Sequence, residues 1–154
     1  MKLGFKKVHP DAKIPTYAHP GDAGMDVYAV EDTLLPVGKP TLVNTGLVAE
    51  IPTGYELQVR PRSGLALKGV TVFNSPGTVD CSFKGQIGVI LLAVVGTQLS
   101  RNCVTGEVTS EFAIRKGDRI AQLVLAPVTR CEPVEVAEVS DTERGTGGFG
   151  STGR

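Results

Sequence analysis

The chain has 154 residues, of which 41% are hydrophobic, and its 16 basic and 16 acidic side chains balance. A chain of this length fits one domain of common size with a single hydrophobic core. The balanced charge gives no global field for nucleic acid or a membrane surface, so neither is an expected partner and any anion site must be local.

Short runs rich in Val, Ile, Leu and Thr follow one another along the chain, separated by turns that contain Gly and Pro. In order, the runs are MDVYAV, PTLVNTGLVAEI, YELQVRP, VTVFNSP, QIGVILLAVV, DRIAQLVLAPV and VEVAEVS. Strand-like runs punctuated in this way predict an all-β barrel or sandwich.

One stretch, SGLALKGV, favours a helix of one or two turns, with Ser63 as its N-cap and Gly69 at its end. The mostly polar segment between Val94 and Phe112 predicts an extended hairpin or a surface loop. Near Asp141 the alternation stops. We therefore expect a barrel over residues 1–140 and a mobile, glycine-rich C-terminal arm over residues 141–154.

The cysteines Cys81, Cys103 and Cys131 are widely spaced and form no CxxC pair, and no signal-peptide-like or long apolar stretch is present. This pattern predicts free thiols and a cytoplasmic, reducing location. His9 and His19 lie far from every cysteine in the sequence, so a zinc site is not expected.

The arm carries the stretch RGTGGFGSTGR, in which GTGGFG matches the dinucleotide-binding pattern GxGxxG. That pattern works only between a strand and a helix, and only four residues follow it here, so we reject the dinucleotide interpretation. The glycine N–H groups, the cation of Arg144 and the hydroxyl of Ser151 could still bind an anion. A disordered tail is the alternative.

Two further stretches offer polar groups at turns. In PRSGLALKG, Arg62 supplies a forked donor and Ser63 and Gly64 open the short helix, which suits an anion site, although a capped turn with a solvated arginine is the alternative. In GTVDCSFKG, Asp80 and Phe83 lie in a predicted hairpin and could hold a water or a sugar hydroxyl, or could simply form a turn.

The other two stretches contain polar residues next to strand-like runs. In KGDRIAQLVLAP, Gln122 either completes a buried hydrogen-bond network or reaches a ligand. In DAGMDVYA, Asp22 and Asp26 suggest assistance from a divalent cation, with a turn cap and a satisfied polar group as the alternatives.

These five stretches, in their order along the chain, resemble the five motifs of the trimeric dUTP pyrophosphatase (dUTPase) family, and the resemblance covers nearly the whole sequence. It implies a jelly-roll-like β-barrel and a homotrimer whose three active sites lie at subunit interfaces, each closed by the arm of another subunit. It also implies hydrolysis of dUTP to dUMP and pyrophosphate, with Mg²⁺ carried on the triphosphate. This reaction limits uracil incorporation into DNA and supplies dUMP for thymidylate synthesis.

The same resemblance implies a role for individual residues. Asp80 would be the general base that activates water for attack at the α-phosphorus, and Asp26 would reach Mg²⁺ through water. Phe83 stands where the family has an aromatic residue, most often Tyr, that stacks under the deoxyribose and excludes a 2′-hydroxyl. Phe149 would cover the uracil.

The implied substrate-binding set divides between the phosphates, the sugar and the base. It consists of Arg62, Ser63, Gly64, Asn74, Gly77, Val79, Phe83, Lys84, Gln122, Arg144, Phe149, Gly150 and Ser151. Backbone N–H and C=O groups of the Gly77 to Phe83 hairpin would read uracil, and a narrow pocket would reject the 5-methyl group of thymine.

Two features depart from the family pattern. Lys84 and Gln86 stand where many members carry Arg and Glu, which could alter trimer contacts. The segment from Val95 to Glu111 is longer than the usual connection and is a candidate binding site for a protein partner.

Three other functions are alternatives to dUTP hydrolysis. A dCTP deaminase needs a glutamate at the pyrimidine ring, and the strand-like run QIGVILLAVV contains no carboxylate, which disfavours that activity. A nucleotide-responsive interaction protein that acts through residues 95–111 stays open and is compatible with catalysis. A plain β-sandwich binding module does not explain the Gly, Phe and Arg of the tail.

Overall fold

The computed structural model describes residues 1–101 and 108–148, without the side chains of residues 98–101, 108 and 109. This part of the chain is nearly all β-structure with one short helix. The elements are β1 (Gly4–Lys7), β2 (Met25–Tyr28), β3 (Thr33–Pro36), β4 (Thr41–Asn44), β5 (Leu47–Glu50), β6 (Tyr55–Arg60), α1 (Ser63–Ala66), β7 (Val70–Val72), β8 (Gly77–Asp80), β9 (Gly88–Ala93), β10 (Gln98–Arg101), β11 (Val108–Ile114) and β12 (Arg119–Pro127).

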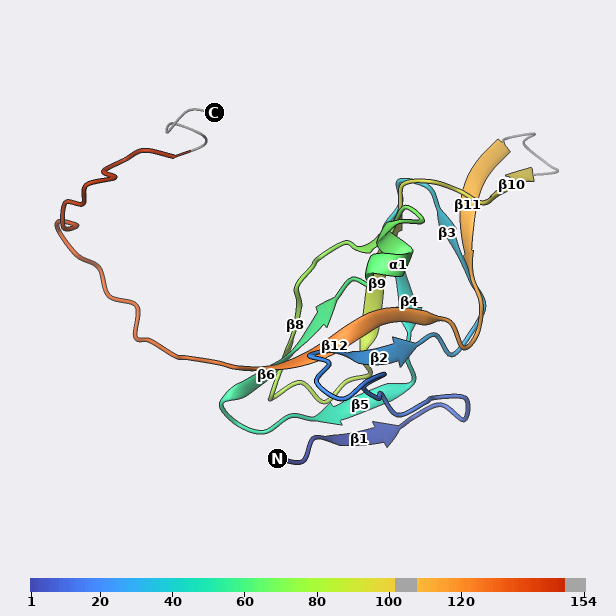
Figure 1. Cartoon of the computed structure of the whole chain (residues 1–154), viewed down its shortest axis with the longest axis horizontal. Coiled ribbons are helices and arrows are strands. Elements are labelled where there is room, and N and C mark those ends of the chain that lie inside the picture. Colours follow the sequence, from blue (N-terminus) through green and yellow to red (C-terminus); the bar gives the residue numbers. More distant parts are fainter. Residues whose placement is uncertain (102–107, 149–154) are drawn as a thin grey trace.

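The strands pair antiparallel in four small sheets that wrap around one another (Figure 1). The largest has the order β2-β12-β6-β8, and β12 is its long central strand. The others have the orders β4-β9-β7, β10-β11-β3 and β1-β5. In the described residues these sheets do not join into one closed ring of hydrogen bonds. The prediction of an all-β, jelly-roll-like fold is confirmed.

A single hydrophobic core lies between the sheets. Burial alternates along β9, whose Val89, Leu91 and Ala93 are fully buried while the residues between them are partly exposed. Leu57 of β6 and Leu123 of β12 enter the same core from the largest sheet. Each fully buried side chain of this size contributes roughly 1.5–3 kcal/mol to folding relative to an exposed one. The side chains that recur at every second position of these strands therefore pack between the sheets and stabilise the fold.

The predicted helix is present, but Ser63 is not its N-cap. Arg62 occupies that position with extended backbone, Ser63 is the first helical residue, and no side chain caps the helix. The helix then ends as expected, because Gly69 has a φ of +79°, a left-handed conformation that glycine adopts without strain. Arg62 at the N-cap has its side chain free to reach other elements.

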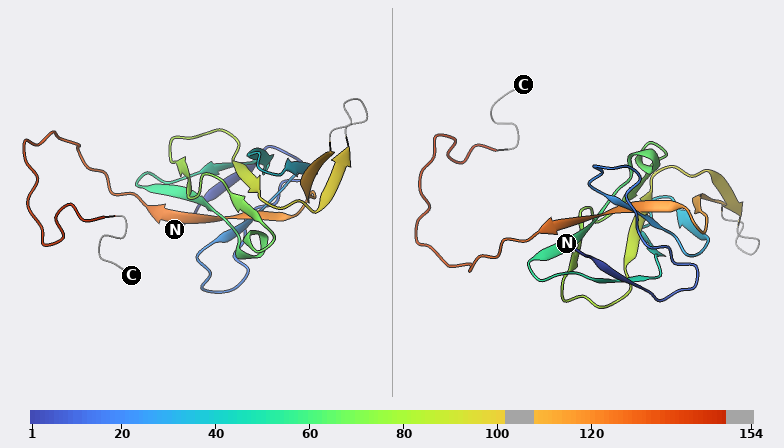
Figure 2. Two further views of the ribbon diagram at one scale, coloured as in Figure 1. Left: turned by 90° about the horizontal axis from the view of Figure 1, so that it is seen from above. Right: turned by 60° about the horizontal axis from the view of Figure 1, so that its bottom comes forward.

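Two of the strand-like runs behave differently from the pattern. PTLVNTGLVAEI forms two strands, β4 and β5, because the chain turns between them at Gly46, which has a φ of +66°. The buried Thr45 hydroxyl donates to the carbonyl of Ile87 at 2.6 Å at the same turn. VEVAEVS forms no strand. Residues 128–148 run away from the sheets after β12 (Figures 1 and 2), and Val134, Val136 and Val139 of that run are exposed.

The segment between Val94 and Phe112 contains the predicted hairpin. Gln98 of β10 lies opposite Glu111 of β11, and β11 also pairs with β3. Residues 102–107, at the turn between β10 and β11, lie outside the described part of the chain. None of the helices in residues 1–101 and 108–148 is long and apolar enough to cross a membrane.

Candidate active site

A small cavity lies where β8 and β9 separate. β8 is the edge of the largest sheet and pairs only with β6, whereas β9 belongs to another sheet. The space between them, about 180 Å³, is lined by Thr78, Val79, Asp80, Phe83, Gln86, Ile87 and Gly88. Because an edge strand presents backbone N–H and C=O groups without strand partners, a flat ring with its own donors and acceptors can pair with them.

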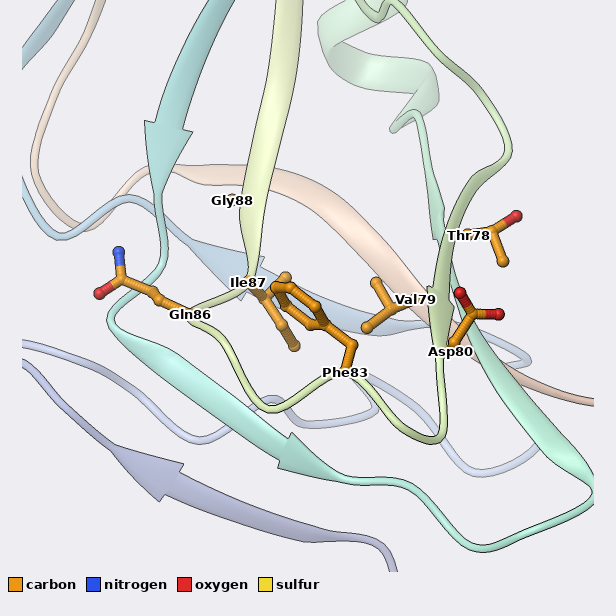
Figure 3. A pocket seen from close by; sticks show the side chains of 7 residues that line it. All are labelled: Thr78, Val79, Asp80, Phe83, Gln86, Ile87 and Gly88. Carbon is orange, nitrogen blue, oxygen red and sulfur yellow. The ribbon is translucent and has the colours of Figure 1, made fainter.

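Aromatic and carboxylate groups take different places around this cavity. Figure 3 shows Val79, Phe83 and Ile87 between the two strands, whereas Asp80 and Thr78 project from the other face of β8. The N–H of Phe83 donates to the carbonyl of Asp80 at 3.0 Å, which closes the turn after β8. This tight turn puts an apolar ring, 46% exposed, beside an exposed carboxylate.

Two more of the predicted site residues, Asn74 and Gly77, lie where the chain turns into β8. The Asn74 amide packs on Gly77, where an added Cβ would lie 3.2 Å from Asn74 Nδ2. Both residues therefore lie at the start of β8, which carries Val79 and Asp80. Lys84 follows Phe83, and its ammonium group forms an exposed ion pair with Glu50 of β5 at 3.0 Å. Such a surface pair contributes little to stability.

A second group of predicted residues meets at the other end of the largest sheet. Asp26 of β2 is 4% exposed. Its Oδ1 accepts from Arg62 Nε at 3.0 Å, and Gln122 Nε2 lies 3.5 Å from the same oxygen. Its Oδ2 accepts from Arg119 Nη1 at 3.1 Å. One buried carboxylate thus joins α1, β2 and β12.

Arg119 was not among the residues predicted from the sequence. It precedes Gln122 by three positions, which in a regular strand would put the two side chains on opposite faces. A register shift between Arg119 and Ala121 inserts an extra residue into β12 and brings both side chains to Asp26. The bulge has no clear signature in the sequence, so only the cation before the strand could have suggested the contact.

Gly24 and Gln122 fit closely together. A Cβ on Gly24 would lie 3.0 Å from Cβ of Gln122 and 3.2 Å from its Cδ. The absence of a side chain at Gly24 therefore leaves the room that the Gln122 amide occupies next to Asp26.

The contacts of Asp26 with two arginines affect whether this carboxylate could bind Mg²⁺. Both carboxylate oxygens of Asp26 already accept from guanidinium groups. Within the described residues, no group of three or more His, Cys, Asp or Glu side chains could hold a metal ion. The described side chains therefore do not form a site that binds Mg²⁺ directly, because Mg²⁺ requires several oxygen ligands in octahedral geometry.

The two groups of residues lie far apart within one chain. Asp80 pairs in register with Glu56 of β6, and Arg62 follows Glu56 by six residues. At about 3.3 Å per extended residue, this separation is roughly 20 Å. One chain therefore does not bring Asp80 and Arg62 into contact with the same small group of atoms.

The arm contributes one predicted residue to the described part of the chain. Arg144 lies on the exposed segment after β12, where its Nε donates to the carbonyl of Gly147 at 2.8 Å. Among the described residues, Arg144 forms no hydrogen bond or ion pair with another predicted site residue. Phe149, Gly150 and Ser151 lie outside the described residues.

Comparison with known proteins gives one consistent family. The dUTPase family model matches residues 10–153. A deoxyuridine 5′-triphosphate nucleotidohydrolase of Picosynechococcus sp. is 51% identical over 99% of both chains, and one of Nautilia profundicola is 47% identical over the full length of both. A mutant dUTPase of Staphylococcus bacteriophage 80alpha, solved with dUpNHpp, has a TM-score of 0.85 at 28% identity and covers 99% of both chains. The chain therefore belongs to the dUTPase family of nucleotide hydrolases.

Proposed function

We propose that this dUTPase hydrolyses dUTP to dUMP and pyrophosphate with Asp80 as the general base. The observation that carries the proposal is the cavity between β8 and β9, with Asp80 and Phe83 on its lining. An exposed carboxylate can orient a water toward the α-phosphorus, and positioning supplies much of the rate in phosphoryl transfer. The base would take the proton of that water as its oxygen bonds to phosphorus and pyrophosphate leaves.

The cavity suits a single pyrimidine ring. Uracil offers one N–H and two carbonyl oxygens on the edge that would meet the strands, so the backbone of β8 can read it as a neighbouring strand would. At about 180 Å³ the space is below the range of pockets for drug-sized ligands, so it suits one small ring rather than a whole nucleotide. Rejection of thymine would then depend on a close contact at the ring carbon that carries its 5-methyl group. The Phe83 ring at the rim would stack under the deoxyribose and exclude a 2′-hydroxyl, and Asn74 and Gly77 would support this half of the site.

The phosphates would be held by the second group of residues. Arg62 and Gln122 meet at Asp26, and Ser63 and Gly64 follow Arg62 in the chain. Guanidinium groups bind phosphate oxygens through several N–H donors at once, which suits a triphosphate. Mg²⁺ would bind the triphosphate itself and reduce its negative charge, since the described carboxylates do not form a site for it.

The active enzyme would be a homotrimer with sites shared between subunits. The separation of about 20 Å between Asp80 and Arg62 supports this, because two P–O–P links cannot span it. The residues after β12 also support it, because they leave their own sheets (Figures 1 and 2) and carry the alternating pattern of a strand, yet they pair with no strand in the described part of the chain. The arm over residues 141–154 would then close a site of another subunit, with Arg144 and Ser151 on the phosphates and Phe149 and Gly150 over the base.

Replacement of the proposed base tests the mechanism. We expect Asp80→Asn to bind dUTP while turnover falls by about 10² to 10⁴-fold, because only the proton acceptor is lost. Pyrophosphate release from dUTP, with dTTP, dCTP and UTP alongside, measures turnover and specificity, and calorimetry with dUpNHpp measures binding. Full turnover by Asp80→Asn would exclude Asp80 as the base. A wild-type chain that does not hydrolyse dUTP would reject the function itself.

The segment 95–111 supports a second, compatible function as a binding site for a protein partner. Its β10 and β11 form a hairpin at the periphery of the molecule (Figure 1), and in the described residues its strand pairing with the other elements is through β3. A hairpin attached in this way could contact another protein while the cavity beside Asp80 works. Deletion of the segment should leave dUTP turnover unchanged and abolish capture of the partner; lost turnover would instead make the segment part of the barrel.

A further inference from the structure

We infer that Asp26 is a positioning residue that holds Arg62 and Arg119 together as one cationic unit for the phosphates of dUTP. The inference rests on the proposed function of Arg62 and deepens it in two ways. It gives Asp26 a role other than contact with Mg²⁺ through water, and it adds Arg119 to the phosphate half of the site.

The contacts of Asp26 support this role first. It is the one charged side chain that is buried among the described residues. A buried carboxylate is strongly unfavourable unless cations and hydrogen bonds compensate it. Here each oxygen has its own guanidinium partner, at 3.0 Å from Arg62 and 3.1 Å from Arg119. Both arginine side chains are thereby fixed to the same small group.

The two arginines would otherwise repel each other. Like charges at short distance disfavour one another, and the carboxylate between them offsets that repulsion. Arg62 Nη1 also donates to the carbonyl of Arg119 at 3.3 Å, so the two residues are connected by a second route. Each guanidinium has five N–H donors, so both retain donors that Asp26 does not use. The unit keeps a net positive charge and a fixed arrangement of free donors.

A cavity next to this unit has the chemistry of a phosphate site. It has a volume of about 280 Å³ and is lined by three cations, Arg62, Arg119 and Lys68, by one carboxylate, Asp118, and by Leu65, Phe112 and Ala113. The side chain of Arg119 is 51% exposed, so its remaining donors can reach a ligand. An anion with several oxygens is the ligand that three nearby cations favour.

The same contacts argue against a role for Asp26 at the metal. Both oxygens of this carboxylate already accept from guanidinium groups, and the positive charge of those groups repels a hydrated Mg²⁺. The two roles therefore make different predictions about what happens when Mg²⁺ is removed.

Nucleotide binding with and without Mg²⁺ separates the two roles. Wild type, Asp26→Asn and Arg119→Gln are titrated with dUpNHpp and with dUMP, first with Mg²⁺ and then in EDTA. We expect both variants to bind dUpNHpp about tenfold or more weakly, in line with lost charge-assisted hydrogen bonds, and dUMP within about twofold of wild type. The loss should have the same size in EDTA. In steady state, KM for dUTP should rise more than kcat falls.

Asp32→Asn is the matched control, because Asp32 also pairs with a guanidinium, that of Arg115, but on the exposed surface. It should bind both nucleotides as wild type does. If Asp26→Asn does not fold, the affinity of Arg119→Gln for the two nucleotides tests the inference instead. This variant should fold, because the Arg119 side chain is half exposed and Asp26 keeps Arg62 as its partner.

Two results would overturn the inference. A loss of dUpNHpp affinity that disappears in EDTA would assign Asp26 to the metal, and equal weakening of dUMP and dUpNHpp would make the cluster merely structural. Neither result depends on catalysis. A wild-type chain that binds dUpNHpp but does not hydrolyse dUTP would reject the proposed function while leaving this inference testable.

Discussion

At the scale of single residues, Gly85 packs closely against the ring of Phe83, the residue that we propose stacks under the deoxyribose. An added Cβ at Gly85 would lie 2.6 Å from Cζ of Phe83, and that half-exposed ring can swing away. We expect Gly85→Ala to change the free energy of unfolding by less than about 1 kcal/mol. The preference for dUTP over UTP in kcat/KM should fall by about tenfold, because the displaced ring no longer excludes the 2′-hydroxyl.

The control for this change is Gly4→Ala on β1, where an added Cβ would meet only Cβ of Glu50, at 3.2 Å. It should keep the wild-type preference. If Gly85→Ala folds normally and still rejects UTP as well as wild type does, the Phe83 ring is not what excludes the ribose.

Single residues also show what sequence reasoning can and cannot reach. Asp80, Val79 and Phe83 line one cavity, because they belong to one strand and the turn directly after it, and their roles stay predictions. Arg119 could not be found in this way, because its contact with Asp26 depends on a bulge. The expected capping by Ser63 was wrong for a related reason: a helix can begin one residue away from the best capping residue when a neighbour makes stronger tertiary contacts.

At the scale of elements, a carboxylate connects two turns of the barrel. Asp32 follows β2, and its Oδ1 accepts from the backbone N–H of Lys116, after β11, at 2.8 Å. This hydrogen bond, aided by the nearby charge of Arg115, lowers the pKa of the Asp32 carboxyl below its ordinary 3.8. The charged form is therefore the one that stabilises the folded chain.

The lowered pKa of Asp32 determines how its contribution to stability changes with pH. The contribution of Asp32 is fully present above its ordinary pKa and is lost as the pH falls through the lower value of the folded state. We expect Asp32→Asn to melt at a lower temperature than wild type at pH 7, and the difference to shrink as the pH falls below about 4. Thermal unfolding at stepped pH measures it. A difference that stays constant down to pH 3 would mean that charge on Asp32 contributes nothing.

The elements also show how far a hydrophobic pattern predicts structure. The runs that became β6 and β9 alternate in burial and find hydrogen-bonding partners within the chain. VEVAEVS has a similar alternation but forms no strand, and none of the strands within residues 1–101 and 108–148 pairs with it. Alternation shows that a segment can pair, whereas pairing also requires a free edge within reach.

At the scale of the whole molecule, the two halves of the proposed site lie at opposite ends of β6. The register places Asp80 opposite Glu56, and Arg62 lies beyond the other end of the same strand. The order of the motifs along the sequence does not predict this separation, because residues near one another in the chain can lie at opposite ends of a strand and contact different subunits. A site shared between subunits would therefore bring Asp80 of one chain to Arg62 of another.

Mixed assemblies test this arrangement. Asp80→Asn and Arg62→Gln are each expected to be nearly inactive alone. Equal amounts of the two variants are unfolded and refolded together. Each site then takes Asp80 from one subunit and Arg62 from another, and each of these residues is intact in half of the subunits. About a quarter of wild-type pyrophosphate release from dUTP should return. Refolding Asp80→Asn with the double variant should restore nothing, because no chain then carries an intact Asp80. If the first mixture also stays inactive although the subunits exchange, both residues act within one chain, and β6 must bend far more than its register with β8 and β12 allows.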